Sequence, residues 1–156
     1  MSARRAAIRV TLAAASPLGP ATLRRTAALV LADQRCRSGL GIIIVDDRAI
    51  RVLNRRHLRH DRATDVIAFP LLGDPVGTGG RAARATQGLL GEVYISATTA
   101  RREARRRGIT AREELSRYLV HGILHLCGYD DHRPSDRRRM WARQEKLVEL
   151  VLNPGS

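Results

Sequence analysis

Blocks of hydrophobic and polar residues alternate along the chain and predict an alternation of strands and helices. Short apolar runs that end at charged or turn-forming residues are typical of strands, whereas apolar residues spaced three and four apart are typical of helices with one buried face. Strands are predicted within residues 6–12, 40–47, 66–72 and 89–95. Helices are predicted at residues 20–37, from 47 to about 53, at 96–108, at 110–127 and from about 135 onwards.

Polar residues and a glycine mark several of the helix ends. Asp47 is expected to cap the second helix and Ser96 the third. Thr110 and Glu113 match a capping box, in which the hydroxyl and the carboxylate each satisfy a backbone amide at the start of the helix. Gly128 is expected to end that helix, because glycine readily adopts the backbone conformation found just after helices.

The order of these elements predicts an α+β fold. We expect a single domain over residues 1–156, in which a small four-stranded mixed sheet packs against about five helices. A polar, cationic segment is predicted at 54–65. The Gly- and Arg-rich segment 73–88 is expected to be a mobile surface loop, and it lacks the Gly-Lys-Ser/Thr ending of a phosphate-binding loop.

The charge of the chain narrows the class of partner. The formal net charge is +13, and every cationic residue except Lys146 is arginine. Such an excess favours a polyanionic partner, with nucleic acid ahead of acidic lipid, although a GC-rich genome also accounts for part of the arginine bias. The two cysteines suggest no disulfide framework, and no apolar run is long enough to span a bilayer. A cytoplasmic location is therefore expected.

The stretch HGILHLCGYDDH, residues 121–132, carries the candidate chemistry. His121 and His125 lie four apart on a predicted helix, which is the spacing by which one helix offers two nitrogen ligands to Zn²⁺. A third ligand after the Gly128 turn, Asp131 or His132, would leave a fourth position open, as in catalytic zinc sites. Histidines at this spacing are also common as ordinary packed or surface residues.

Two neighbours of these histidines bear on the interpretation. Gly122 stands where zinc proteases of the His-Glu-x-x-His type have their general base, which argues against peptide hydrolysis by that mechanism. Cys127 falls on another face of the helix than His125 and is expected to be a packing residue.

Three blocks of the sequence, 53–70, 89–96 and 121–130, resemble the YbeY family of bacterial rRNA maturation factors, which are described as metal-dependent endoribonucleases. The resemblance implies one Zn²⁺ per chain and single-strand-specific cleavage of RNA in rRNA processing, at the 3′ end of the small-subunit rRNA, with a part in ribosome quality control. It implies rRNA, the small subunit and its proteins as partners, and a monomeric chain. The alternative is a non-catalytic ribosome-assembly factor with a structural zinc, closed by both Asp131 and His132.

The resemblance also implies roles for particular residues. The family's third ligand is a His at the eleventh motif position, where this chain has Asp131. His132 comes one residue later, and the spacing slightly favours Asp131. The family's catalytic arginine falls on Leu58, so Arg59 or Arg56 is the candidate to hold negative charge on the phosphorus oxygens.

Other polar residues have two interpretations each. Glu92 is a candidate hydrogen-bond partner of a metal ligand, or a polar residue of an edge strand. The arginines of the 96–108 helix would hold the RNA backbone, or form a solvated helix face. Because aromatic residues are only 3% of the chain, base stacking is expected to contribute little. The arginines concerned are Arg101, Arg102, Arg105 and Arg106, with a further run from Arg133 to Arg139.

Overall fold

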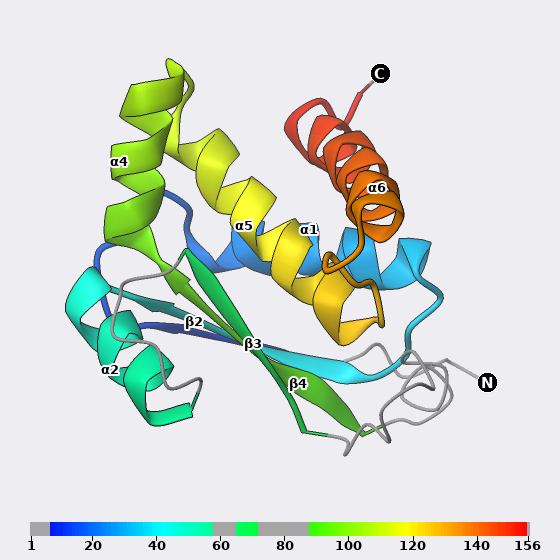
Figure 1. Ribbon diagram of the computed structural model, residues 1–156, viewed down its shortest axis with the longest axis horizontal. Helices are drawn as coiled ribbons and strands as arrows, with labels where there is room; N and C mark the ends of the chain where they lie inside the picture. Colours follow the sequence, from blue (N-terminus) through cyan, green and yellow to red (C-terminus); the bar gives the residue numbers. More distant parts are fainter. Residues whose placement is uncertain (1–6, 58–64, 72–87, 156) are drawn as a thin grey trace.

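The computed structural model describes residues 7–57, 65–71 and 88–155, which form one four-stranded sheet and the helices packed on it (Figure 1). The strand order is β1-β2-β4-β3. The first three strands in that order run parallel, and β3 lies at the edge, antiparallel to β4. The strands are β1 (Ile8–Leu12), β2 (Gly39–Val45), β3 (Val66–Pro70) and β4 (Leu89–Ser96).

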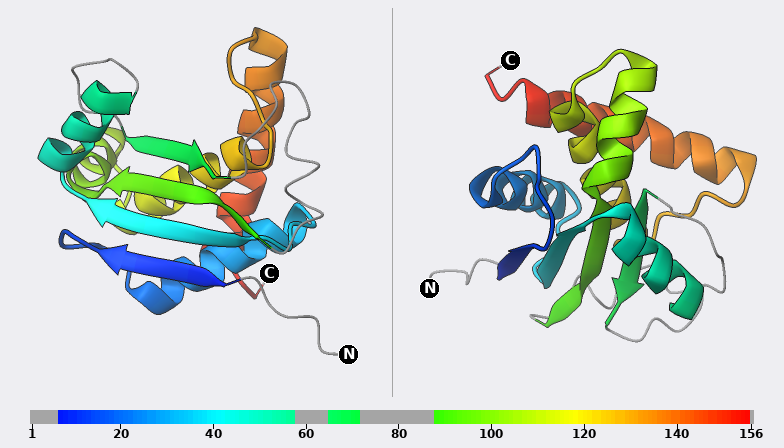
Figure 2. Two further views of the ribbon diagram at one scale, coloured as in Figure 1. Left: turned by 90° about the horizontal axis from the view of Figure 1, so that it is seen from below. Right: turned by 90° about the vertical axis from the view of Figure 1, so that its left-hand side faces the viewer.

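The helices cover the two faces of the sheet unequally (Figure 2). Two helices pack on one face and bury the larger core with alternate residues of the strands, and a third helix packs on this pair. A single helix packs on the other face, where it buries a smaller cluster. Helices α1 (Pro20–Asp33) and α5 (Ala111–Leu126) pack on the face with the larger core, and α6 (Pro134–Leu152) packs on these two helices. Helix α2 (Asp47–His57) packs on the other face, and α4 (Ala97–Arg107) follows β4 directly.

The predicted α+β fold, with a four-stranded mixed sheet and five helices in the described part of the chain, is confirmed. Two expectations on α2 were wrong. The helix continues to His57, so residues 54–57 form its last turn and are not the start of a separate polar segment. Its cap is Asp46, whose Oδ1 accepts the amide hydrogen of Ala49 at 2.8 Å, while Asp47 lies inside the helix.

Helix α1 ends at Asp33 and not at 37 as predicted, because Arg35 adopts a left-handed backbone conformation with a φ of 53°. Other boundaries follow the caps that the sequence suggested. The Ser96 and Thr110 hydroxyls each accept an amide hydrogen three residues on, from Thr99 and Glu113. Gly128 has a φ of 101° at the end of α5, a conformation that favours glycine. The predicted 73–88 loop lies outside the described residues except for Gly88.

Helix α5 packs tightly against the sheet at Gly122. A Cβ atom there would lie 2.6 Å from Val93 Cγ1 and 3.0 Å from Val66 Cγ2, so only glycine fits without displacing these valines. A glutamate at this position would point into the valines of the sheet. The structure thus gives a physical reason why this helix lacks the base of the zinc proteases.

Within the described residues, no helix is both long and apolar enough to cross a membrane.

Candidate metal centre

Three ligand groups converge where α5 ends and the chain turns toward α6. His121 Nε2 and His125 Nε2 lie 3.0 Å apart. Asp131 Oδ2 lies 3.4 Å from His125 Nε2 and 3.9 Å from His121 Nε2. Atoms bound to one tetrahedral zinc at its usual bond lengths are about 3.3 Å apart. The three atoms are therefore spaced as the ligands of a single small cation.

Hydrogen bonds at Nδ1 fix which nitrogen of each imidazole is available. His125 Nδ1–H donates to the backbone oxygen of Tyr129 at 3.1 Å. His121 Nδ1–H donates to Gln144 Oε1 at 2.8 Å. The Gln144 amide is itself oriented, because its Nε2 donates to Glu145 Oε2 at 3.2 Å. Each ring therefore presents an Nε2 lone pair toward the other ring and Asp131.

This arrangement fits a bound metal. Two facing Nε2 lone pairs and a carboxylate oxygen repel one another unless a proton or a metal cation lies between them. Burial, followed by the neighbouring His121, lowers the pKa of His125 below its usual range, which favours the neutral form that ligates metals. His121, His125 and Asp131 could together hold a metal ion.

The two candidates for the third ligand point in different directions. The carboxylate of Asp131 faces the histidine pair. The His132 side chain is 86% exposed, and its Nδ1 contacts the carboxylate of Asp130 instead. The geometry therefore favours Asp131, the residue at the family's spacing.

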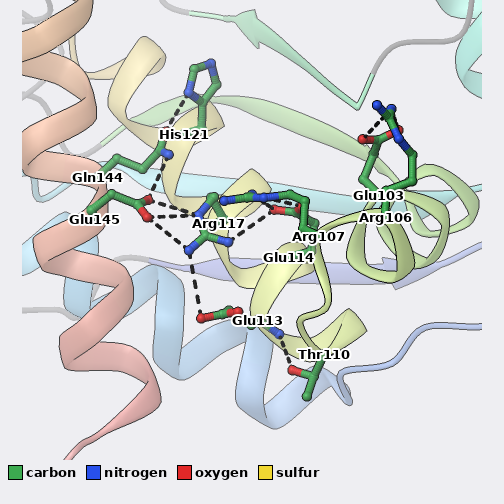
Figure 3. Close-up of polar contacts among 10 residues, drawn as sticks. All are labelled: Glu103, Arg106, Arg107, Thr110, Glu113, Glu114, Arg117, His121, Gln144 and Glu145. Atoms are coloured by element: carbon green, nitrogen blue, oxygen red, sulfur yellow. Dashed lines mark hydrogen bonds and ion pairs between the residues drawn. The ribbon is translucent and has the colours of Figure 1, made fainter.

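A partly buried network of charged residues supports the Gln144 side of this centre (Figure 3). Arg117 donates from Nε and Nη2 to both carboxylate oxygens of Glu145, at 2.9 and 3.0 Å. Its Nη1 donates to Glu114 at 3.2 Å, and Arg107 donates to the same glutamate at 3.0 Å. Glu145 thus ties α6 to α5 and holds Gln144 against His121.

Sequence patterns did not single out this network or Gln144. Charged residues on amphipathic helices normally lie on the solvated side. The available signal was that Glu114 and Arg117, three apart, fall among apolar positions of the predicted helix, which is unusual for charges unless they are paired.

A pocket of about 370 Å³ opens beside the metal ligands. His121 and Asp131 form part of its wall, so a cation held there would be accessible to a molecule in the pocket. Helices α4, α5 and α6 contribute most of the remaining wall. The other lining residues are Asp65, Glu103, Arg107, Glu114, Arg117, Tyr118, Arg137, Met140, Trp141 and Gln144.

Comparison with known proteins identifies the family. A family model described as Endoribonuclease YbeY matches residues 15–151. The chain belongs to the endoribonuclease YbeY family. The YbeY endoribonuclease of Anaeromyxobacter sp. (strain Fw109-5) is 43% identical over 156 residues, which cover 94% of this chain and 77% of that protein. That of Anaeromyxobacter dehalogenans (strain 2CP-C) is 46% identical over 137 residues, which cover 84% of this chain and 66% of that protein.

A solved structure agrees with the YbeY assignment. The solution structure of TM1509 from Thermotoga maritima superposes with a TM-score of 0.60 at 28% identity, covering 94% of this chain and 90% of that one. The curated YbeY names describe RNA-cleaving hydrolases, and the expected family resemblance is confirmed.

The structure does not bring every predicted site residue to the candidate metal centre. Glu92 lies in the interior strand β4, between Gly91 and Val93, which face Leu126 and Gly122 of α5. Its side chain therefore points to the opposite face of the sheet, where it contacts the hydroxyl of Tyr94 at 3.4 Å. Glu92 is neither at a sheet edge nor placed to orient a histidine of the centre.

The candidate catalytic arginines and the arginines of α4 lie elsewhere. Arg56 is exposed on α2, on the face of the sheet opposite α5, and Arg59 falls outside the described residues. Arg101 donates to the backbone oxygen of Ala15, and Arg102 pairs with Asp47 at 2.8 Å. Arg105 and Arg106 are also exposed on α4. Among the interactions of the described residues, neither arginine contacts another helix or strand.

Proposed function

We propose that this chain is a zinc-dependent endoribonuclease that cleaves single-stranded RNA in the cytoplasm during rRNA maturation, at the 3′ end of the small-subunit rRNA and in ribosome quality control. Membership of the YbeY family supports RNA cleavage. The observation that carries the proposal is the convergence of His121, His125 and Asp131 in the wall of an open pocket. Small-subunit rRNA and its proteins would be the partners.

The residues of the centre have separable tasks. His121, His125 and Asp131 would hold the metal, while Gln144 and the Tyr129 carbonyl keep both Nε2 atoms aimed at it. A bound divalent cation would polarise a phosphoryl oxygen and supply an activated water near neutral pH.

An arginine of the pocket wall would complete the site. Arg137 lies in that wall and would offer its guanidinium group to the phosphodiester, which gains negative charge on its oxygens during in-line displacement. Arg59 remains a proposed catalytic residue, because it directly follows Leu58, the position on which the family's arginine falls.

The rival function is a non-catalytic ribosome-assembly factor with a structural zinc. A structural site is normally closed by a fourth protein ligand. His132 was the candidate for that ligand, and its side chain is exposed and contacts Asp130. The open pocket beside the ligands therefore favours the catalytic proposal.

The test compares RNA cleavage and metal content in four zinc-loaded proteins: the parent chain, His121→Ala, Asp131→Ala and His132→Ala. We expect His121→Ala and Asp131→Ala to lose bound metal and to cleave a single-stranded RNA more than about a hundredfold more slowly. Loss of a ligand's hydrogen-bond partner costs up to about a hundredfold, and loss of the ligand itself should cost more. His132→Ala should retain both properties. A parent that holds one metal tightly and does not cleave would overturn the catalytic proposal in favour of the structural one.

A further inference from the structure

Trp141 is the single tryptophan of the chain, and it lies in the wall of the pocket that contains His121 and Asp131. Its side chain is 51% exposed. A large aromatic side chain that is half exposed beside a candidate catalytic centre is available for contact with whatever enters the pocket.

The position of Trp141 on α6 places it close to the metal ligands. Arg137, Trp141 and Gln144 are four and three residues apart, so they share one face of the helix. Gln144 accepts the hydrogen bond from His121 Nδ1. The tryptophan therefore lies three residues, or about 4.5 Å along the helix axis, from the residue that orients a ligand. Met140, which is buried, fixes the same turn of α6 in the core.

Several charged residues of the pocket wall are paired with one another, so RNA binding at the pocket is expected to depend on more than electrostatic attraction. The described wall contains three arginines and four carboxylates. Arg107 and Arg117 both bond to Glu114, so much of their charge is already compensated. A nucleic acid would therefore gain little from the bare wall by phosphate attraction, whereas stacking of a base on an aromatic ring contributes substantially to single-strand binding.

We propose that Trp141 forms a base-stacking subsite, in which the indole ring holds one nucleobase of single-stranded RNA while the adjoining phosphodiester lies at the metal centre. This inference rests on the proposed function and adds a substrate contact to it. It replaces the expectation, drawn from the low aromatic content, that stacking contributes little. One aromatic ring at the site is sufficient, since stacking requires a ring face and no particular base edge.

The first test uses the intrinsic fluorescence of the chain, which reports on this subsite alone because there is one tryptophan. The zinc-loaded protein is mixed by stopped flow with a short oligoadenylate or with linear polyphosphate of matched charge, and emission is recorded before cleavage proceeds. We expect oligoadenylate to quench the tryptophan and polyphosphate to leave it nearly unchanged. Equal quenching by both, or none by RNA, would overturn the subsite.

The second test separates binding from chemistry. Trp141→Ala should raise KM for single-stranded RNA by about fivefold to a hundredfold and leave kcat unchanged, and Trp141→Phe should recover part of the loss. Leu150→Ala is the matched control, because Leu150 is also an exposed apolar residue of α6 and is not among the residues of the pocket wall. A KM change in Trp141→Ala no larger than in Leu150→Ala would contradict the proposal.

The two tests distinguish failure of the subsite from failure of the proposed function. Quenching by oligoadenylate and not by polyphosphate, in a protein that does not cleave RNA, would keep the subsite and reject the catalytic proposal. Cleavage by a protein whose tryptophan does not respond to RNA would keep the catalytic proposal and reject the subsite.

Discussion

The two histidines of the centre are held by partners of different kinds. His125 Nδ1–H donates to a backbone oxygen, which no substitution of a side chain can remove. His121 Nδ1–H donates to the side chain of Gln144, which is 2% exposed and belongs to another helix. The orientation of His121 can therefore be altered without changing any ligand.

Gln144→Leu should weaken metal binding by about ten- to a hundredfold, because His121 loses the acceptor that keeps its Nε2 free for the metal. Leucine is similar in size, so the core beneath α6 should remain packed. The measurement is competition for zinc with a chelator of known affinity. Gln144→Glu keeps an acceptor for His121 but replaces the donor to Glu145 with a second carboxylate oxygen, so it should recover only part of the affinity.

Lys146→Ala is the control for this experiment, since Lys146 is exposed on the same helix. Unchanged zinc affinity in Gln144→Leu would show that the hydrogen bond does not orient His121.

At the scale of elements, Asp47 joins α2 to α4. Its Oδ1 accepts hydrogen bonds from the Ser96 and Thr99 hydroxyls, each at 2.5 Å, and its Oδ2 accepts one from Arg102 at 2.8 Å. Burial raises the pKa of Asp47, but these three hydrogen bonds outweigh it and hold the pKa at about 2. The ionised carboxylate is thus the form that the fold stabilises.

The sign of the pH dependence follows from this lowered pKa. The contribution of Asp47 to stability is fully present above its ordinary pKa of 3.8 and is lost as the pH falls toward about 2. Asp47→Asn should lower the free energy of unfolding at pH 7 by about 1.5–3 kcal/mol, the range for hydrogen bonds to a charged group. The difference from the parent should shrink as urea unfolding is repeated between pH 4 and pH 2.

Asp46→Asn provides the comparison for Asp47→Asn. Asp46 caps α2, and asparagine caps helices about as well as aspartate, so its stability at pH 7 should change little. An Asp47→Asn protein as stable as Asp46→Asn would contradict the proposed link between the two helices.

The elements themselves were largely predictable because each carries its own periodic pattern and several carry their own caps, as Ser96 and Thr110 do. The extension of α2 through Asn54 was missed, since that polar residue is buried and a pattern of hydrophobicity cannot distinguish a buried polar residue from a loop residue. The grouping of His121, His125 and Asp131 was predictable from spacing within one short segment. Gln144 was not, because its partner His121 belongs to a different helix, and pairing across helices is set by tertiary packing.

At the scale of the whole molecule, the arginines that give the chain its net charge of +13 fall into two groups, those paired within the fold and those exposed to solvent. Some arginines are used within the fold: Arg117 is buried in its network, and Arg102 holds Asp47. Others extend into solvent. Arg105 is exposed, and Arg106 is 73% exposed, with a partner, Glu103, on its own helix. The formal charge alone therefore overstates what is available to an RNA backbone.

The exposed arginines of α4 should affect RNA binding through its salt dependence. Each phosphate contact to single-stranded nucleic acid adds about 0.7 to the slope of log affinity against log salt. If Arg105 and Arg106 each contact a phosphate, the double substitution to glutamine should reduce the magnitude of that slope by about 1.4. Its thermal stability should be nearly unchanged, because exposed ion pairs such as that of Arg106 contribute little to stability.

Arg102→Gln is the informative comparison for the double variant, because Arg102 lies on the same helix but is tied to Asp47. It should lower the stability of the fold and leave the salt slope close to that of the parent. Binding is measured by fluorescence anisotropy of a labelled single-stranded RNA over a series of salt concentrations. If the double variant kept the parent's slope, the excess positive charge on α4 would have to act on something other than the RNA backbone, and the solvated-face interpretation of these arginines would be the correct one.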